Sequence, residues 1–171
     1  VFIVELMGRN SGHIAFNVGV ACAAEQIISF ENFDPSYRSE KLAELAKEIF
    51  VQQRSKDKSY LIVLAENLWA GGAMNLAAQL KDQYNIDCAA CVLGHIQRGG
   101  SPVAKDRILA TKLGVGAVQV IKERKSLLML GERNNEIAEI ALSDAIKQTK
   151  TVNENLVAAQ QNILALTARS K

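Results

Sequence analysis

Residues Leu93 to Pro102 read L-G-H-I-Q-R-G-G-S-P, and this stretch says more about the fold than any other. The apolar run Cys91–Leu93 leads into a glycine, and the Ser-Pro pair at the end opens a long helical pattern. Glycines let the backbone approach a ligand closely, and arginine presents a planar fork that matches phosphate oxygens. The amino end of the following helix adds oriented N–H groups and a partial positive charge. The stretch therefore predicts a strand end, a phosphate-binding loop and a helix start.

The same alternation of strand and helix runs along the rest of the chain. Strands are predicted at residues 1–6, 26–30, 60–65, 86–93 and 127–130. Helices are predicted at residues 14–25, 40–53, 70–84, 103–123, 144–150 and 154–168. The 60–65 run is apolar throughout, which is typical of a strand buried in a parallel sheet. Since strands that alternate with helices need crossover connections, we expect an α/β fold with a mainly parallel sheet flanked by helices.

Three of these strands end in polar groups that are able to bind a ligand. The three ends are Met7-Gly8-Arg9, Glu66-Asn67, and the segment from His95 to Arg98. In open α/β sheets, ligands bind beyond the carboxyl ends of the strands. Because three such ends come from one predicted sheet, they indicate a single binding site.

Each of these groups also has an ordinary structural interpretation. Arg9 alone reads as a surface or ion-paired arginine, and a lone His95 reads as a core histidine. Glu66 could cap the helix that begins near Trp69, since acidic groups favour helix amino ends. The glycines beside Arg9 and Arg98 favour the binding interpretation, in which arginine contacts phosphate and Glu66 accepts hydrogen bonds from sugar hydroxyls.

Composition excludes several classes of function. The chain has 171 residues, of which 49% are hydrophobic and 22% charged, as in ordinary globular domains. A net charge of +2 is too weak to indicate a nucleic-acid partner. No apolar run approaches the ~20 residues that a membrane helix needs. The first residues, Val1-Phe2-Ile3-Val4, resemble a strand rather than a signal peptide, and no Met precedes them, so we expect a chain that begins inside a larger protein.

The cysteines predict no disulfide framework. Cys22, Cys88 and Cys91 make an odd set, which favours a reducing compartment. Cys88 and Cys91 form a C-x-x-C pattern, but they lie in a predicted strand, where residues three apart face opposite sides. We therefore expect buried thiols rather than a zinc or redox site.

The sequence contains no complete catalytic motif of a known type. A G-x-S-x-G elbow, a Walker A loop and a kinase catalytic-loop pattern are all absent, and no cluster has metal-ligand spacing. The residues themselves thus predict an α/β sheet whose strand ends bind a phosphorylated, hydroxyl-rich small molecule.

Together these motifs resemble the 6-phosphofructokinase family. The matching segments are V-E-L-M-G-R-N-S-G at 4–12, A-A-E at 23–25, L-A-E at 64–66, V-L-G-H-I-Q-R-G-G-S-P at 92–102 and D-R-I-L-A at 106–110. The resemblance covers almost the whole chain and weakens after about Gly131. It implies the carboxyl-terminal half of a two-lobed fold. Residues 1–98 would form the fructose 6-phosphate lobe, 99–131 would belong to the nucleotide lobe, and 132–171 would be a helical return segment.

The resemblance also implies roles for the residues at matching positions. Substrate contacts fall on Met7, Gly8, Arg9, Glu66, His95, Ile96, Gln97 and Arg98. Among these, Arg9 would also stabilise the transferring phosphoryl group, Glu66 would hold sugar hydroxyls, and the segment 95–98 would hold the 6-phosphate. An effector-binding segment falls on Ala23, Ala24 and Glu25, with a basic loop in uncertain register at Lys56 and Lys58.

Two arginines that the family donates across a subunit interface have no counterpart here. One position, six residues before His95, is Ala89, and the other would precede Val1. Lys81 or another base could replace Ala89 if the segment is shifted. Ala89 keeps open a non-catalytic regulatory half that binds a sugar phosphate.

As a family member, the chain would take part in the phosphorylation of fructose 6-phosphate at its 1-hydroxyl in glycolysis. The implied setting is a cytoplasmic homo-oligomer, a tetramer when intact, with no nucleic-acid or membrane partner. The family's glycine-rich phosphate loops and catalytic aspartate are absent from this sequence. We therefore expect ATP and Mg²⁺ to be bound mainly by the missing half and the chain alone to be inactive. Pyrophosphate remains open as an alternative phosphoryl donor.

Overall fold

The computed structural model describes residues 1–54, 59–148 and 151–169, with side chains up to residue 162. It divides into two compact units. Unit 1 comprises Val1–Arg98 together with Thr151–Lys171, and unit 2 comprises Gly99–Lys150.

Unit 1 is built on a four-stranded sheet with the strand order β2-β3-β1-β4. The strands are β1 (Phe2–Leu6), β2 (Gln26–Ile28), β3 (Leu61–Ala65) and β4 (Ala89–Val92). Each of the three pairings is parallel. The register sets Leu6 opposite Ala65 and Glu5 opposite Val92, so the carboxyl ends of β3, β1 and β4 lie at one edge. The predicted α/β fold with a mainly parallel sheet is confirmed.

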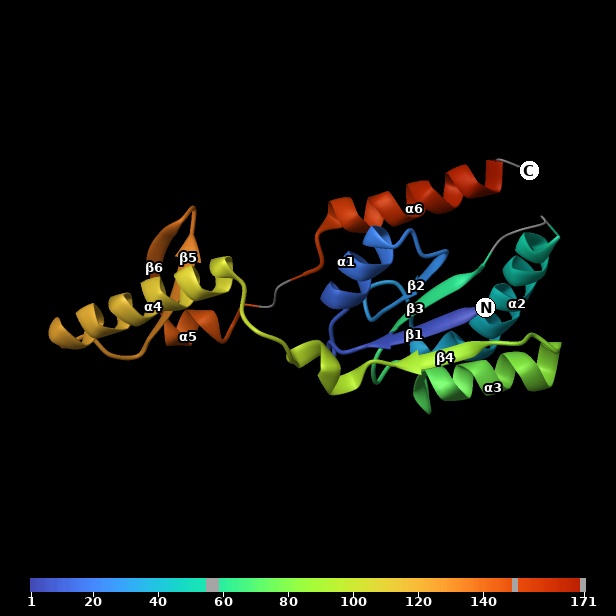
Figure 1. Cartoon of the computed structure of the whole chain (residues 1–171), viewed down its shortest axis with the longest axis horizontal. Helices are drawn as coiled ribbons and strands as arrows, with labels where there is room; N and C mark the ends of the chain where they lie inside the picture. Colours follow the sequence, from blue (N-terminus) through green and yellow to red (C-terminus); the bar gives the residue numbers. More distant parts are fainter. Residues whose placement is uncertain (55–58, 149–150, 170–171) are drawn as a thin grey trace. The chain divides into compact units, whose positions relative to one another are not determined.

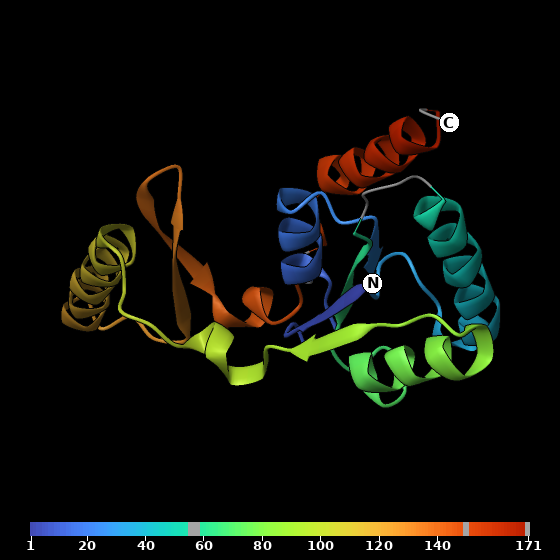
Figure 2. The same cartoon turned by 45° about the vertical axis from the view of Figure 1, so that its right-hand side comes forward.

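Helices cover both faces of this sheet (Figures 1 and 2). The flanking helices are α1 (His13–Ala21), α2 (Arg38–Gln53), α3 (Gly72–Tyr84) and α6 (Glu154–Arg169). One core packs Ile62 of the sheet against Leu45 of α2 and Leu76 of α3. A second core on the opposite face packs Val63 against Phe16 of α1. The sheet strands are apolar on both faces because both faces are covered.

Trp69 packs inside unit 1. Its ring stacks on Phe33 with centroids 5.8 Å apart, and its Nε1 donates to Gln79 Oε1 at 3.0 Å. Two short 3₁₀ helices, η1 (Pro35–Tyr37) and η2 (Gly94–Arg98), complete the connections.

The expectation of buried thiols at Cys88 and Cys91 is wrong for Cys91, which is exposed, while Cys88 is partly buried. Cys22, for which burial was not predicted, is also exposed. Cys91 belongs to β4, which lies at the edge of the sheet and is largely exposed. Cys22 follows the last residue of α1, because this helix ends at Ala21 rather than at the predicted residue 25.

Unit 2 contains α4 (Ala104–Lys122), β5 (Leu128–Arg133), β6 (Glu136–Ala141) and α5 (Leu142–Ala145). The predicted strand at 127–130 is one arm of an antiparallel hairpin, whose second strand the sequence analysis missed. Asn134 and Asn135 connect the arms with φ values of 53° and 69°, the left-handed pair that fits the twist of a two-residue hairpin turn. The Asn-Asn pair is the signal that could have revealed this turn. Helix α5 ends at Ala145, and residues 149–150 of the predicted helix lie outside the described residues.

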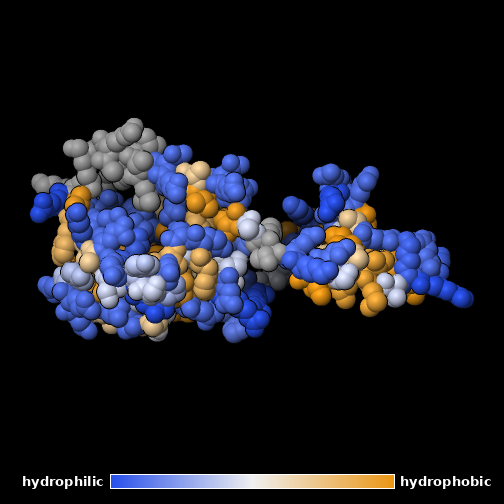
Figure 3. Space-filling model, turned by 180° about the vertical axis from the view of Figure 1, so that it is seen from behind, coloured by the Kyte–Doolittle hydropathy of each residue, from blue (hydrophilic) through white to orange (hydrophobic). Residues whose placement is uncertain are grey.

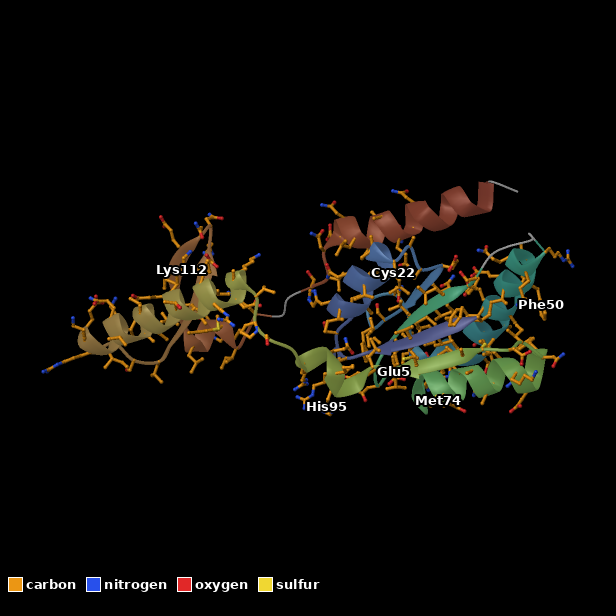
Figure 4. The ribbon with its side chains drawn as sticks, viewed as in Figure 1. Glu5, Cys22, Phe50, Met74, His95 and Lys112 are labelled. Carbon is orange, nitrogen blue, oxygen red and sulfur yellow. The ribbon has the colours of Figure 1, made fainter. Side chains whose placement is uncertain are left out.

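Unit 2 lacks a core of its own. None of its described residues, 99–148, is buried. Ile108, Val115, Val118 and Ile121 on α4 are each more than half exposed, and Figure 3 shows hydrophobic side chains gathered on the surface of this unit. Contacts at the surface hold α4 to the hairpin. Lys112 Nζ lies 2.7 Å from Asn135 Oδ1 (Lys112 is labelled in Figure 4), and the side chains of Leu130 and Ile137 lie beside Gly116 of α4. A hairpin with two helices and no buried side chains is marginal in water.

We expect the backbone amides of β5 and β6 to exchange with solvent faster than those of β1 and β3. The exchange rates should differ by roughly a hundredfold or more, which corresponds to a difference of about 2.8 kcal/mol in the free energy of local opening. Hydrogen exchange followed by NMR on the dilute chain measures this ratio, and a second, lower concentration controls for self-association. Equal protection of β5 and β3 at both concentrations would contradict the absence of a core in unit 2.

Candidate functional site

The three polar strand ends meet at one edge of unit 1. Glu66 N donates to Leu6 O at 2.9 Å and Leu93 N donates to Glu5 O at 3.2 Å, so the parallel pairing continues to the first residues of both loops. A pocket of about 510 Å³ opens at this edge. It is lined by Met7, Gly8, Arg9, Ile14, Glu66, Asn67, Gln97 and Arg98. This volume lies in the range of small-molecule sites.

Glu66 binds the loop that follows β1. Its Oε1 accepts hydrogen bonds from Gly8 N at 3.1 Å and from Arg9 N at 2.8 Å. Gly8 is required for the tight path of this loop, because a Cβ there would collide with the carbonyl oxygen of Ser11. The helix-cap interpretation of Glu66 is therefore wrong.

The carboxylate that caps α3 belongs to Glu5. Its Oε2 accepts a hydrogen bond from Ala73 N in the first turn of α3 at 2.6 Å. Gly72 has a φ of +64°, and a Cβ at this position would collide with the same oxygen. Glu5 lies on β1, on the side of the sheet next to α3 (Figure 4). Sequence reasoning missed this role, although a lone carboxylate inside the apolar strand Val4-Glu5-Leu6 is the signal for it.

Gln97 joins the loop after β4 to the same segment. Its Oε1 accepts a hydrogen bond from Met7 N at 2.8 Å. The backbone N–H groups of Met7, Gly8 and Arg9 are thus all bound by side chains from the two neighbouring strand ends. This arrangement fixes the path of the β1 loop at the floor of the pocket.

The electrostatics of the pocket keep Glu66 ionised. The hydrogen bonds from the amides of Arg9 and Gly8 lower the pKa of the Glu66 carboxyl below its ordinary value of 4.5. The charges of Arg98 and His95 lower this pKa further, and partial burial opposes them. At neutral pH the pocket therefore combines one carboxylate with two arginines, Arg9 and Arg98.

The structure brings together most of the predicted substrate-binding residues. Met7, Gly8, Arg9, Glu66, Gln97 and Arg98 line the pocket. His95 and Ile96 lie on η2 outside this lining, both exposed, with His95 labelled in Figure 4. Asn67 and Ile14 also line the pocket. The sequence analysis placed Asn67 at a polar strand end without giving it a role of its own, and it did not single out Ile14.

The predicted effector segment lies away from the pocket, at the amino end of β2. Ala23 has a φ of +50°, and Ala24 is buried. Both carboxylate oxygens of Glu25 accept hydrogen bonds from the protein, Oε2 from Leu61 N at 2.7 Å and Oε1 from Gln52 Nε2 at 3.4 Å. Lys56 and Lys58 lie outside the described residues.

The basic group suggested as a substitute at Ala89 is already paired. Lys81 lies in the last turn of α3, and its Nζ is 2.6 Å from Asp87 Oδ1. Because this turn precedes β4, Lys81 lies near the amino ends of the strands, whereas the pocket lies at the carboxyl ends.

Within residues 1–54, 59–148 and 151–169, no group of three or more His, Cys, Asp or Glu side chains could hold a metal ion. None of the helices in the same part of the chain is long and apolar enough to cross a membrane.

Curated relatives match nearly the whole chain. A protein of Thermus thermophilus, named ATP-dependent 6-phosphofructokinase 1, is 41% identical over 97% of this chain and 49% of its own length. ATP-dependent 6-phosphofructokinase 2 of Bacteroides thetaiotaomicron is 40% identical over 92% of this chain and 47% of its own length. The chain therefore spans about half the length of these relatives.

Solved structures share the fold. Phosphofructokinase from Saccharomyces cerevisiae superposes with a TM-score of 0.68 at 31% identity, over 95% of this chain and 22% of that chain. A pyrophosphate-dependent phosphofructokinase from Marinobacter aquaeolei superposes with a TM-score of 0.69 at 22% identity, over 95% of this chain and 47% of that chain. At that identity the second likeness shows the fold alone.

The sequence also matches the family model described as phosphofructokinase over residues 1–121. This range contains β1 to β4 and the whole lining of the pocket. The chain belongs to the phosphofructokinase family.

Proposed function

We propose that this chain supplies the sugar-phosphate-binding half of a 6-phosphofructokinase. The reaction is transfer of a phosphoryl group from ATP to the 1-hydroxyl of fructose 6-phosphate, giving fructose 1,6-bisphosphate in glycolysis. The observation that carries the proposal is the pocket in which an ionised Glu66 faces the same space as Arg9 and Arg98. The names of the curated relatives support ATP as the donor.

The chemistry of the pocket suits a phosphorylated sugar. Glu66 uses Oε1 for the β1 loop, and among the described residues Oε2 has no hydrogen-bond partner, so Oε2 is available to a sugar hydroxyl. Arg9 and Arg98 offer guanidinium groups that bind phosphate oxygens through two parallel hydrogen bonds. A volume of about 510 Å³ accommodates a hexose phosphate.

The two arginines take different roles in the proposal. Arg98, with His95, Ile96 and Gln97 of the same short helix, holds the 6-phosphate of the sugar. Arg9, with Met7 and Gly8, contacts the sugar from the β1 loop and neutralises charge on the phosphoryl group in transit. Phosphoryl transfer depends mainly on such positioning and charge neutralisation.

The donor site belongs to the other half of the enzyme. The uncovered apolar face of α4 supports the assignment of residues 99–131 to a nucleotide-binding lobe whose remaining part covers this face. ATP and Mg²⁺ are held mainly by that part, and residues 132–171 form the return segment. The intact enzyme is a cytoplasmic homo-oligomer, a tetramer in the family.

The effector assignment of Ala23, Ala24 and Glu25 remains part of the proposal. Each oxygen of Glu25 accepts one hydrogen bond from the protein, and each keeps a lone pair for an effector or its metal ion. The weaker of these contacts is the bond from Gln52. That bond, at 3.4 Å, is the longer of the two.

A second candidate function is a regulatory half that binds the sugar phosphate without catalysing transfer. The exposed Ala89 on β4 favours it, because the family's arginine at this position would extend from the sheet edge toward a neighbouring subunit. The presence of Arg9 in the pocket favours the catalytic function.

The isolated 171-residue chain should form no fructose 1,6-bisphosphate from ATP and fructose 6-phosphate, since the donor-binding residues lie elsewhere. A coupled assay for the bisphosphate at millimolar substrates measures this. The positive control is a complete two-lobed subunit that contains this sequence. Turnover by the chain comparable to that of the complete subunit would contradict the proposal that the donor-binding residues lie outside this chain.

Replacement Arg9→Ala in the complete subunit should lower kcat by about 10³-fold, the effect typical of an arginine that stabilises a phosphoryl transition state. The KM for fructose 6-phosphate should rise far less. Arg124→Ala is a matched control, because Arg124 shares the left-handed φ of 56° but lies after α4 in unit 2. If Arg9→Ala weakened sugar binding and left kcat unchanged, the regulatory function would replace the catalytic one.

The carboxyl of Glu66 should titrate below pH 4.5 in the folded chain. Because its pKa is lowered by folding, the stabilising contacts with Gly8 and Arg9 are complete above 4.5 and are lost as pH falls through the lower, folded value. NMR of the side-chain carboxyl carbon and of the Gly8 and Arg9 amides should show one common midpoint. The Glu66→Gln variant removes this transition and serves as the control. A midpoint at or above 4.5 would refute the predicted effect of the amides.

A further inference from the structure

Arg9 has an unusual backbone conformation for its residue type. Its φ is +56°, in the left-handed region that residues other than glycine rarely adopt. Such conformations persist where the surroundings over-determine them, and they concentrate at functional sites. Contacts around Arg9 must therefore hold it.

Two consecutive side chains hold both polar groups of the Arg9 backbone. The N–H donates to Glu66 Oε1 at 2.8 Å, and the carbonyl oxygen accepts from Asn67 Nδ2 at 3.4 Å. The Glu66 contact also involves Gly8, whereas the Asn67 contact reaches Arg9 alone. The hydrogen bond from Asn67 is thus specific to the Arg9 backbone, whereas Glu66 also binds Gly8.

The backbone conformation of Asn67 explains how the side chains of Glu66 and Asn67 both contact the loop after β1. Consecutive residues of an extended strand point to opposite sides. Asn67 leaves β3 with a φ of +64°, a conformation that asparagine tolerates better than most residues. This left-handed turn brings its side chain to the same loop as that of Glu66, at the lining of the pocket.

We propose that Asn67 is a positioning residue for Arg9. By holding the Arg9 carbonyl, it fixes the backbone from which the Arg9 side chain enters the pocket. The effect on catalysis rests on the function proposed above, in which Arg9 stabilises the transferring phosphoryl group. Small displacements of a catalytic side chain reduce the rate strongly while binding of the rest of the substrate is retained.

Two replacements separate the hydrogen bond from the turn. Asn67→Gly keeps the left-handed backbone accessible and removes the donor. Asn67→Asp keeps the shape and the tolerance for this conformation but places a carboxylate oxygen where the donor was. The matched control is Asn85→Asp, because Asn85 is also left-handed, with a φ of +55°, and caps the carboxyl end of α3.

Steady-state kinetics of the complete two-lobed subunit test the proposal. For both Asn67 variants, kcat should fall by about tenfold to a hundredfold. The KM for fructose 6-phosphate should change by less than about threefold in Asn67→Gly and should rise further in Asn67→Asp, because the added carboxylate repels the phosphorylated sugar. Asn85→Asp should match the unaltered enzyme. An active enzyme whose kcat is unaffected by Asn67→Gly and Asn67→Asp would overturn the positioning role, as would a rise in KM without a fall in kcat.

The backbone chemical shifts of Arg9 in the isolated chain give a readout that needs no activity. They should change in both Asn67 variants, while the shifts of residues in β1 and β3 stay fixed and show that the sheet is intact. If the unaltered complete subunit proved inactive, the proposed function would fail, and the Arg9 shifts would still decide whether Asn67 holds this peptide. Unchanged Arg9 shifts in both variants would overturn the inference.

Discussion

The hydrogen bonds from the Gly8 and Arg9 amides to the Glu66 carboxylate connect the end of β1 to the end of β3, and the pocket depends on them. They lower the pKa of Glu66 below its ordinary value, so its carboxylate remains ionised to lower pH than an unperturbed glutamate. They leave Oε2 available to a ligand and help to hold Arg9 in a left-handed conformation. One side chain thus shapes the loop, contributes charge and presents an acceptor. In the proposed function, Oε2 would accept a hydrogen bond from a sugar hydroxyl, and the arginines of the pocket, Arg9 and Arg98, would bind phosphate oxygens.

This contact is possible only because the sheet places three strand ends side by side. The order β2-β3-β1-β4 makes β3 and β4 the neighbours of β1. The sequence predicted this edge well, since the apolar strands and the polar groups after them are local patterns that parallel pairing brings together. The sequence therefore predicts that the polar ends at Arg9, Glu66 and Arg98 share one edge, and all three line the pocket there. The motif from Leu93 to Pro102 also led to the family, which the relatives and the family model confirm.

Other features were missed, most of them because they depend on contacts between distant residues and one because a local turn signal was not recognised. The carboxylate within Val4-Glu5-Leu6 marks Glu5 as unusual, but its partner in α3 follows only from the position of β1 against the start of that helix. The role of Asn67 depends on its left-handed turn, which a sequence does not state. The hairpin of unit 2 was missed because the Asn134-Asn135 turn was not recognised. The exposure of Cys91 follows from the position of β4 at the sheet edge, which becomes visible only once the strand order is known.

Titration of the isotopically labelled chain with fructose 6-phosphate, followed by NMR, tests the central claim that the pocket binds a sugar phosphate. The account predicts saturable shifts of the Met7, Gly8 and Arg9 amides and of the Glu66 carboxyl, at millimolar ligand. Inorganic phosphate alone should shift Arg98 and leave the Glu66 carboxyl largely unchanged, since phosphate offers no sugar hydroxyls. Saturable binding that leaves Gly8, Arg9 and Glu66 unperturbed, or no binding at all at these concentrations, would contradict the account.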